Sequence, residues 1–206
     1  MIPNLIKETS SVDKTWKRVL DIFNRSDRAK QILKLTERAF SCGFQELKES
    51  EGPYNLPKGV LIHSLQTFLI AEQIFPFKQY IDSLALLSVY HQMGDMGSLV
   101  RKKNSSVLRF IKQNFPFELP VHAKSNIIIS QYVNLNWPET QSLYLMDCKE
   151  ISSICVNNIL SSCLFAAHML SYSYVGNSAD FKDYFNFYAD AKIGSQVDFS
   201  DIVDEV

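Results

Sequence analysis

The feature that most constrains the fold is the spacing of apolar residues, which recur every three to four positions over most of the chain. Near the N-terminus, Val12, Trp16, Val19 and Phe23 keep this spacing, which is the period of an α-helix with one buried face. The chain holds only 7 Gly and 7 Pro, few for a protein built from many strands and tight turns. The sequence therefore predicts an all-α, multi-helix bundle in a single domain.

Capping and breaking residues divide the chain into helices. Ser10 and Ser11 can cap a first helix and Ser26 a second, which Gly43 is expected to end. Further helices are predicted over residues 57–74, 77–91, 106–114, 121–133, 137–174 with a break near 146–147, and 180–190. We expect a helical extension packed on the bundle, a helical core, and a C-terminal helix with an acidic tail, at residues 1–56, 57–176 and 177–206.

Composition limits the classes of partner that are expected and indicates the cellular compartment. The 21 basic and 22 acidic residues nearly cancel, which disfavours a nucleic-acid protein that binds through bulk charge. The N-terminal residues contain no apolar stretch typical of a secretory signal, and no run is long enough to span a bilayer. The four cysteines lack CxxC spacing and are expected to be buried free thiols. These features predict a cytoplasmic protein without a membrane partner.

Basic residues gather in one segment, because residues 101–124 hold six of them and a single acid, Glu118. A patch of this kind can contact phosphate groups, although a solvated loop and helix face would have the same composition. The candidate phosphate-binding residues are Arg101, Lys102, Lys103 and Arg109.

Three of the four histidines lie in apolar helical segments. A single histidine in such a place usually satisfies its two ring nitrogens within the core. His63, His91 and His168 fall on three separate predicted helices, and bundles build metal sites from inward-facing side chains of neighbouring helices. Three such histidines are therefore harder to explain as separate core residues than one would be. His122 follows Pro120 at a helix start; it could join such a site, but it is expected at the surface.

These segments resemble the HD superfamily of metal-dependent phosphohydrolases. Residues 59–65 (GVLIHSL) are similar to the family's helix with the first histidine, and residues 86–95 (LLSVYHQMGD) to the segment that carries the His-Asp doublet. Residues 166–171 (AAHMLS) are similar to the family's Ala-Asp-x-Leu-Ser ending. The resemblance implies an HD-like helical core and a metal site.

The sequence departs from the family at the acids. Gln92 stands in place of the doublet's aspartate, Asp95 in place of the motif's lysine, and His168 in place of the terminal aspartate. A neutral amide supplies no charge to hold a cation. The resemblance still allows one divalent ion, Zn, Fe or Mn, held by His63, His91 and His168, with Asp95 four residues after His91 as a further ligand or a catalytic group.

Two functions follow from the resemblance, and a third stays open. The first is a degenerate domain whose phosphohydrolase activity is lost or weakened and which acts as a binding or regulatory module. The alternative is an active metal-dependent phosphohydrolase on a nucleotide or other phosphate ester, in which Asp95 orients the attacking water and the basic segment screens phosphate charge. The third is an unrelated all-α protein-interaction domain. The partners expected are a nucleotide, another phosphorylated ligand or a protein.

Overall fold

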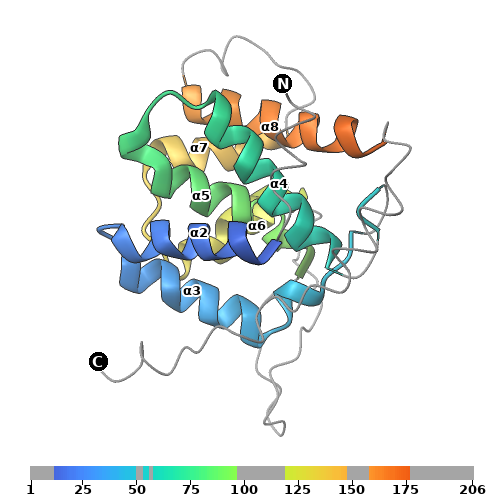
Figure 1. Ribbon diagram of the computed structural model, residues 1–206. Helices are drawn as coiled ribbons and strands as arrows, with labels where there is room; N and C mark the ends of the chain where they lie inside the picture. The colour runs from blue at the N-terminus through green and yellow to red at the C-terminus, as the bar shows by residue number, and fades with distance from the viewer. Residues whose placement is uncertain (1–11, 50–52, 56–57, 97–118, 148–157, 177–206) are drawn as a thin grey trace, which may run out of the picture.

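A computed structural model describes residues 12–49, 53–55, 58–96, 119–147 and 158–176, and all regular structure in this part of the chain is helical. The prediction of an all-α bundle is confirmed. The α-helices run over α2 Val12–Arg25, α3 Ala29–Ser41, α4 Gly59–Ile74, α5 Ile81–Tyr90, α6 Val121–Ser130, α7 Trp137–Met146 and α8 Ile159–Gly176 (Figure 1). Short 3₁₀ turns lie at η1 Phe44–Glu46, η2 Lys78–Tyr80 and η3 Met93–Met96.

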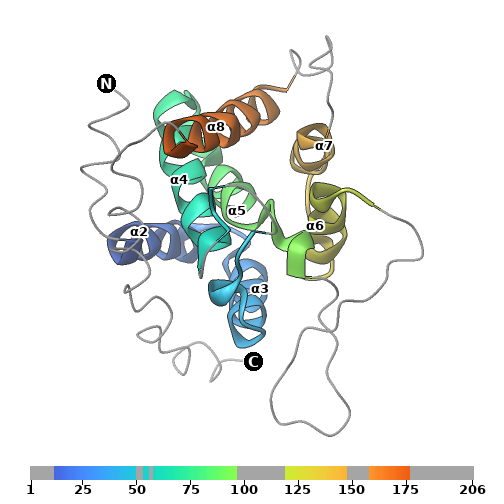
Figure 2. The ribbon, with the colours of Figure 1, turned by 90° about the vertical axis from the view of Figure 1, so that its right-hand side faces the viewer.

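Helices α4 and α5 form the centre of the bundle. Helix α8 packs along α4, α2 crosses α4 and α5 on another side, and α3 lies beyond α2 (Figures 1 and 2). On the far side, α6 packs against η3 and α7, and α7 also contacts α8. One cluster of buried apolar residues takes in α2, α3, α4, α5, α6, α7 and α8.

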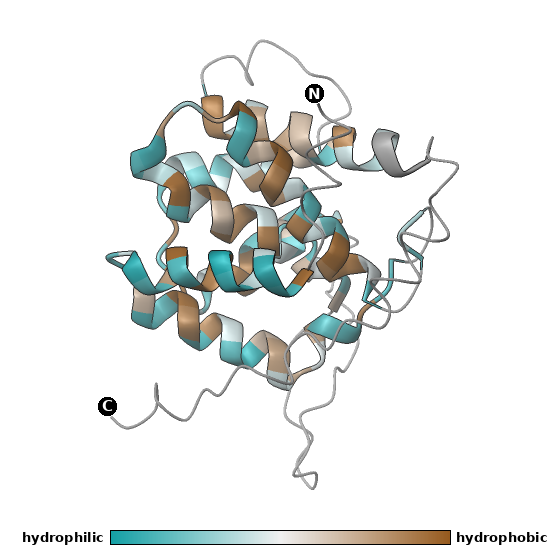
Figure 3. Ribbon diagram, viewed as in Figure 1, coloured by the Kyte–Doolittle hydropathy of each residue, from teal (hydrophilic) through white to brown (hydrophobic). Residues whose placement is uncertain are grey.

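The difference in hydropathy between helices explains which of them lie at the centre of the bundle. Helices α4 and α5 are buried on nearly every face, which suits helices that are apolar all round. Helices α2 and α3 instead show teal and brown stripes in Figure 3, because they bury one face and leave the other to solvent. The first predicted helix is thus confirmed from Val12, with Trp16, Val19 and Phe23 in the core.

Helix boundaries follow the predicted breakers with small shifts. Helix α3 begins at Ala29, and the Ser26 hydroxyl accepts a hydrogen bond from the Arg28 amide in the preceding turn, so Ser26 is not its N-cap. Gly43 follows the helix end with φ 87°, a left-handed conformation that favours glycine. Helix α5 begins only at Ile81, since Lys78–Tyr80 form a 3₁₀ turn. The helices predicted over 106–114 and 180–190 lie outside the described residues.

The segment before α4 is attached to that helix by backbone contacts. The Val60 amide donates to the Leu47 carbonyl, and the Glu49 amide donates to the Tyr54 carbonyl. Gly59 allows this approach, because a Cβ atom there would lie 1.8 Å from the Tyr54 carbonyl oxygen. Residues from outside the predicted core segment are thereby held beside the helix that carries His63.

Gly94 has a similar role after α5. The sequence marks this glycine as a helix breaker, and the structure adds a packing reason: a Cβ atom would lie 2.0 Å from the Val121 carbonyl oxygen at the start of α6. The Ser125 hydroxyl accepts a bond from the Gly94 amide at 2.7 Å and donates to the His91 carbonyl at 2.5 Å. Helix α6 therefore fixes the turn that follows His91.

A part-buried ion pair joins Arg28, the residue before α3, to α7. The Arg28 guanidinium donates to both carboxylate oxygens of Glu139, at 2.6 and 2.8 Å, and the Glu139 side chain is fully buried. Glu139 also accepts from the Asn136 amide, while Asn136 accepts from the Glu139 amide, which makes a capping box at the start of α7. This network sets the position of α7 against the N-terminal helices.

Cys42 and Cys163 are free, buried thiols, as predicted, whereas Cys148 and Cys155 lie outside the described residues. Within the described ranges, no helix combines the length and apolar character needed to cross a bilayer.

Candidate metal centre

His63, His91 and His168 come together at the middle of the bundle. Their facing ring nitrogens form a nearly equilateral triangle: His63 Nε2 lies 3.0 Å from His168 Nδ1 and 3.2 Å from His91 Nε2, and the third edge is 3.1 Å. His63 and His91 are fully buried, and His168 is partly exposed. Helices α4 and α8 each supply one histidine, and His91 follows directly on the end of α5, where its own amide still donates to the Leu87 carbonyl.

A hydrogen-bond chain fixes the tautomer of His63. The Tyr54 hydroxyl donates to the side-chain oxygen of Gln66, an atom that can only accept. The Ser171 hydroxyl, 2.6 Å from Tyr54, must then act as the donor of that pair. Its oxygen is left to accept from His63 Nδ1 at 3.1 Å. The proton of neutral His63 is therefore on Nδ1, and Nε2 presents a lone pair to the triangle.

The tautomer of His91 is fixed more simply. Its Nδ1 lies 2.8 Å from the Ser88 carbonyl oxygen, which can only accept. Neutral His91 thus carries its proton on Nδ1, and its Nε2 is also a lone pair. Outer hydrogen bonds of this kind, which orient a ring and fix its tautomer, are typical of metal-ligating histidines.

The triangle is electrostatically unfavourable without a cation at its centre. Two lone pairs, on His63 and His91, face each other at 3.2 Å, and the single proton available to His168 Nδ1 cannot bond well to both. Ligands at about 2.05 Å from one ion are about 3.3 Å apart in a tetrahedron and about 2.9 Å apart in an octahedron. The observed edges of 3.0–3.2 Å lie between these values, so the three nitrogens fit one divalent transition-metal ion.

Burial keeps the three imidazoles neutral. It lowers the pKa of His63 and His91 well below the ordinary value, and the neighbouring histidines lower both further. Burial, with a smaller effect of His122, lowers the pKa of His168 to about 3. Only neutral imidazole ligates a metal, so the fold holds all three rings in the ligating form at neutral pH.

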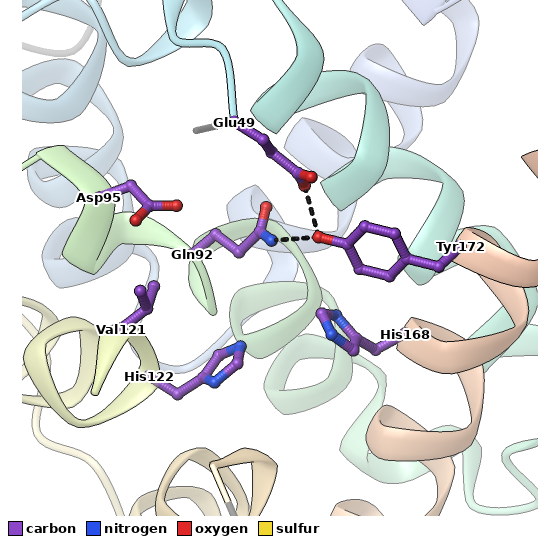
Figure 4. A pocket seen from close by; sticks show the side chains of 7 residues that line it. All are labelled: Glu49, Gln92, Asp95, Val121, His122, His168 and Tyr172. Atoms are coloured by element: carbon purple, nitrogen blue, oxygen red, sulfur yellow. Dashed lines mark hydrogen bonds between the residues drawn. The ribbon is translucent and has the colours of Figure 1, made fainter. Parts of the chain in front are cut away.

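A polar cavity of about 210 Å³ opens beside His168 (Figure 4). Its described lining comes from the segment before α4, the turn after His91, the start of α6, and α8, and consists of Glu49, Gln92, Asp95, Val121, His122, His168 and Tyr172. Because His168 also belongs to the triangle, the cavity lies directly beside the three ring nitrogens.

One wall of the cavity is a three-residue network. Tyr172 donates its hydroxyl to Glu49 at 2.8 Å and accepts from the Gln92 amide nitrogen at 3.0 Å (Figure 4). Glu49 is buried, and this burial raises the pKa of its carboxyl to about 7. The ring of Tyr172 lies over His63 and His168, with centroids 4.5 and 5.0 Å away. The network therefore connects the N-terminal segment to the histidines.

His122 lies in this cavity, so the expectation of a surface position is wrong. It is 9% exposed, its ring stacks on His91 at 5.6 Å, and in Figure 4 it points toward His168. Its Nδ1 lies 2.6 Å from the Asp147 carboxylate, and its Nε2 is buried without a hydrogen-bond partner. The partner that draws His122 inward is an acid 25 residues further along the chain, which local sequence does not reveal.

The other predicted site residues have mixed placements. Asp95 lines the cavity but is not part of the group of closely spaced ligand atoms formed by the three histidines. Gln92 directs its amide nitrogen at Tyr172. The candidate phosphate-binding residues Arg101, Lys102, Lys103 and Arg109 lie outside the described residues.

Sequence reasoning missed Glu49, Asp147 and the pair Tyr54 and Ser171. Glu49 and Tyr54 stand in a loop-like segment rich in turn residues, where nothing in the local pattern points to a site. Ser171 did carry a signal, since it follows His168 by three positions and so lies on the same side of the helix.

Comparisons of the chain with protein-family models, with curated proteins and with solved structures find no match.

Proposed function

We propose that this protein is a transition-metal-binding helical domain of the HD type, with a degenerate doublet, in which His63, His91 and His168 hold one divalent ion. The observation that carries the proposal is the 3.2 Å approach of two imidazole lone pairs whose tautomers are fixed by Ser171 and by the Ser88 carbonyl. A cation is the simplest partner for such a pair.

Zinc is the first choice for the ion. Three neutral imidazoles suit Zn²⁺ and Fe²⁺, whereas Mn²⁺ prefers carboxylate and water ligands. Among the described residues the closely spaced ligand set contains no carboxylate. Three protein ligands leave a position open for water or a small molecule, and an ion there would act as a Lewis acid toward whatever occupies it.

The polar surroundings support a binding or regulatory role over phosphate hydrolysis. Gln92, in place of the HD aspartate, contributes no charge and hydrogen-bonds to Tyr172. The described lining of the cavity carries two carboxylates, from Glu49 and Asp95, and no lysine or arginine. A phosphate ester in contact with these two carboxylates would be repelled by them.

The test is metal stoichiometry. Protein stripped with a chelator and then dialysed against Zn²⁺ is expected to retain one zinc per chain by elemental analysis. His63→Ala, His91→Ala and His168→Ala should each abolish stoichiometric retention, with far-UV circular dichroism used to check that the variant is folded. His168→Ala matters most, because His168 is the partly exposed member and its replacement disturbs the core least.

His122→Ala is the matched control, since it removes a buried histidine in the same cavity that is not part of the triangle. It should keep the zinc. Loss of zinc from His122→Ala alone, or retention in all three triangle variants, would contradict the proposed ligand set. Zinc-loaded protein should also leave p-nitrophenyl phosphate and nucleoside triphosphates intact.

The second candidate function is an active metal-dependent phosphohydrolase, and His122 is the observation that favours it. A histidine with a carboxylate on Nδ1 and a free Nε2 in a cavity can accept or donate a proton. Asp95, in the same cavity, would help to orient water. Metal-dependent release of phosphate that is lost in both His63→Ala and His122→Ala would favour this candidate over the binding module.

A further inference from the structure

The described walls of the cavity present mainly hydrogen-bond acceptors. Glu49 and Asp95 contribute carboxylates, Gln92 an amide oxygen and His122 a ring nitrogen. Two donors of this lining are already used: the Tyr172 hydroxyl donates to Glu49, and the Gln92 amide nitrogen donates to Tyr172. His168, with Nδ1 facing the triangle, keeps its proton on Nε2 as a further donor. A ligand that contacts Glu49, Gln92 and His122 must therefore bring donors.

Two side-chain atoms of this lining are buried and make no hydrogen bond, and the His122 nitrogen is an acceptor when the neutral ring donates its proton to Asp147. The side-chain oxygen of Gln92 and Nε2 of His122 make no hydrogen bond, although the residues are 6% and 9% exposed. Leaving a buried polar atom without a hydrogen-bond partner has a free-energy cost. Both residues line the cavity, so a bound molecule with two or more donor groups would remove this cost at both atoms.

The charge balance selects the type of donor. An ion in the histidine triangle would add two positive charges to a site whose described lining includes the carboxylates of Glu49 and Asp95. A cationic ammonium ligand would be repelled by the ion, and an anionic phosphate by the carboxylates. A hydroxyl group avoids both effects, because its oxygen can face the ion while its proton faces an acceptor.

The size of the cavity limits the ligand. Its volume of about 210 Å³ exceeds the roughly 30 Å³ of one water molecule but falls below the approximately 300–1,000 Å³ of pockets for drug-sized ligands. A molecule with a few hydroxyl groups fits this range better than a nucleotide does.

We propose that the cavity beside His168 binds a small, uncharged polyhydroxyl compound, with hydroxyl groups that donate to Glu49, Gln92 and His122. The open position of an ion in the triangle would take one hydroxyl oxygen of the same ligand. This last contact rests on the proposed metal-binding function, whereas the donor–acceptor contacts belong to the chain itself.

The probe is sorbitol, added to zinc-loaded and to metal-free protein at pH 8, above the pKa of about 7 of Glu49. Binding is followed by calorimetry and by the NMR shifts of the histidine ring protons. Sorbitol should bind the zinc-loaded protein with a millimolar or lower dissociation constant, and more weakly in the absence of zinc. Inorganic phosphate and methylammonium at the same concentration should not move the His122 resonances.

Glu49→Gln removes a charged acceptor and should weaken sorbitol binding about tenfold. Gln92→Leu should abolish binding, because it removes an unpaired acceptor. Glu46→Gln changes an exposed carboxylate on the same segment and should leave sorbitol binding unaltered.

Zinc retention without any sorbitol binding would overturn this inference and leave the metal proposal intact. Sorbitol binding to a protein that retains no zinc would support the donor–acceptor contacts and contradict the proposed function. Preferential binding of phosphate or methylammonium, or equal effects of Glu49→Gln and Glu46→Gln, would also overturn the inference.

Discussion

His63 Nε2 and His91 Nε2 lie 3.2 Å apart, and the outer hydrogen bond of each ring places a lone pair on the nitrogen that faces the other. Two neutral acceptors at this distance repel each other in a buried site. Helices α4 and α5 hold these rings rigidly, because both helices are buried on nearly every side. The fold thus maintains an arrangement that a bound cation would stabilise.

Removal of the Ser171 hydroxyl should weaken metal binding without loss of the fold. Ser171→Ala frees His63 Nδ1 from its acceptor, so the ring can rotate or adopt the other tautomer. Changes to such outer partners typically cost about 10–100-fold in metal affinity. Competition with a chromophoric chelator would measure the zinc affinity of the variant.

Ser173→Ala is the control for this prediction, because Ser173 is exposed on the same helix. Its zinc affinity should equal that of the unmodified protein. Equal affinities for Ser171→Ala and Ser173→Ala would show that the hydrogen-bond chain does not set the tautomer of His63.

Acid should destabilise the metal-free protein. The folded-state pKa values of His63, His91 and His168 lie below the unfolded value of about 6.5, and that of His168 is about 3. The unfolded chain therefore binds more protons below pH 6.5, and the free energy of unfolding decreases as the pH falls from about 6.5 toward 3. Each histidine contributes up to about 1.4 kcal/mol per pH unit.

Glu49 acts in the opposite direction. Its pKa is raised to about 7 in the fold, so the folded state binds the extra proton and gains stability as the pH falls through this range. The stability gained by protonation of one carboxyl is smaller than the stability lost through three histidines, so acid lowers the free energy of unfolding overall. Urea denaturation at several pH values would measure the free energy of unfolding. In Glu49→Gln, this free energy should decrease more steeply as the pH falls. Stability that stays constant between pH 7 and 5 would contradict the buried, neutral state of the triangle.

Breaking the ion pair between Arg28 and Glu139 should have a large effect on stability. Arg28→Met leaves the carboxylate of Glu139 fully buried without its guanidinium partner. Loss of one partner of a buried pair costs about 3–5 kcal/mol. The double change Arg28→Met with Glu139→Gln should recover part of this loss, because it removes the uncompensated charge.

Arg25→Met tests whether the effect belongs to the pair. Arg25 is exposed at the end of α2, and a surface change of this kind usually alters the free energy of unfolding by no more than about 0.5 kcal/mol. Chemical denaturation of the three variants would give the values. Similar losses for Arg25→Met and Arg28→Met would exclude a special contribution of Glu139.

An acid at position 92 should strengthen metal binding. Gln92→Asp introduces the residue type of the HD doublet that this segment resembles and brings a negative charge close to the triangle, for which we expect roughly a tenfold gain in zinc affinity. Asparagine has the same side-chain length as aspartate but no charge, so Gln92→Asn serves as the control. If both variants bind zinc equally well, a charge at position 92 does not affect the ion. That result would contradict a role for position 92 like that of the aspartate in the HD doublet.

The helical bundle was predictable because its signals are local. The spacing of Val12, Trp16, Val19 and Phe23 marks α2, and Gly43 stops α3 where a left-handed residue is needed. The start of α3 was misplaced because the Ser26 hydroxyl, which can cap a helix, instead donates to Asp82 and accepts within the preceding turn. A capping residue has its expected role only if tertiary contacts leave it free.

The candidate site was predictable only in its histidines. His63, His91 and His168 stood out because each interrupts an apolar helix. Glu49 reaches the cavity through tertiary packing, from a segment with no periodic pattern. Asp147, at the end of α7, pairs with His122 across 25 residues, which no local signal indicates. Contacts between residues far apart in sequence depend on how helices pack, and a single sequence does not encode that packing in any local signal.

The most direct test of the account is X-ray absorption at the zinc edge of stoichiometrically loaded protein, with elemental analysis on the same sample. The account predicts one zinc per chain, with three imidazole nitrogens at about 2.0–2.1 Å, an additional light-atom ligand and no sulfur. A chain that binds no zinc at micromolar concentrations, or a zinc with cysteine sulfur in its coordination shell, would contradict it.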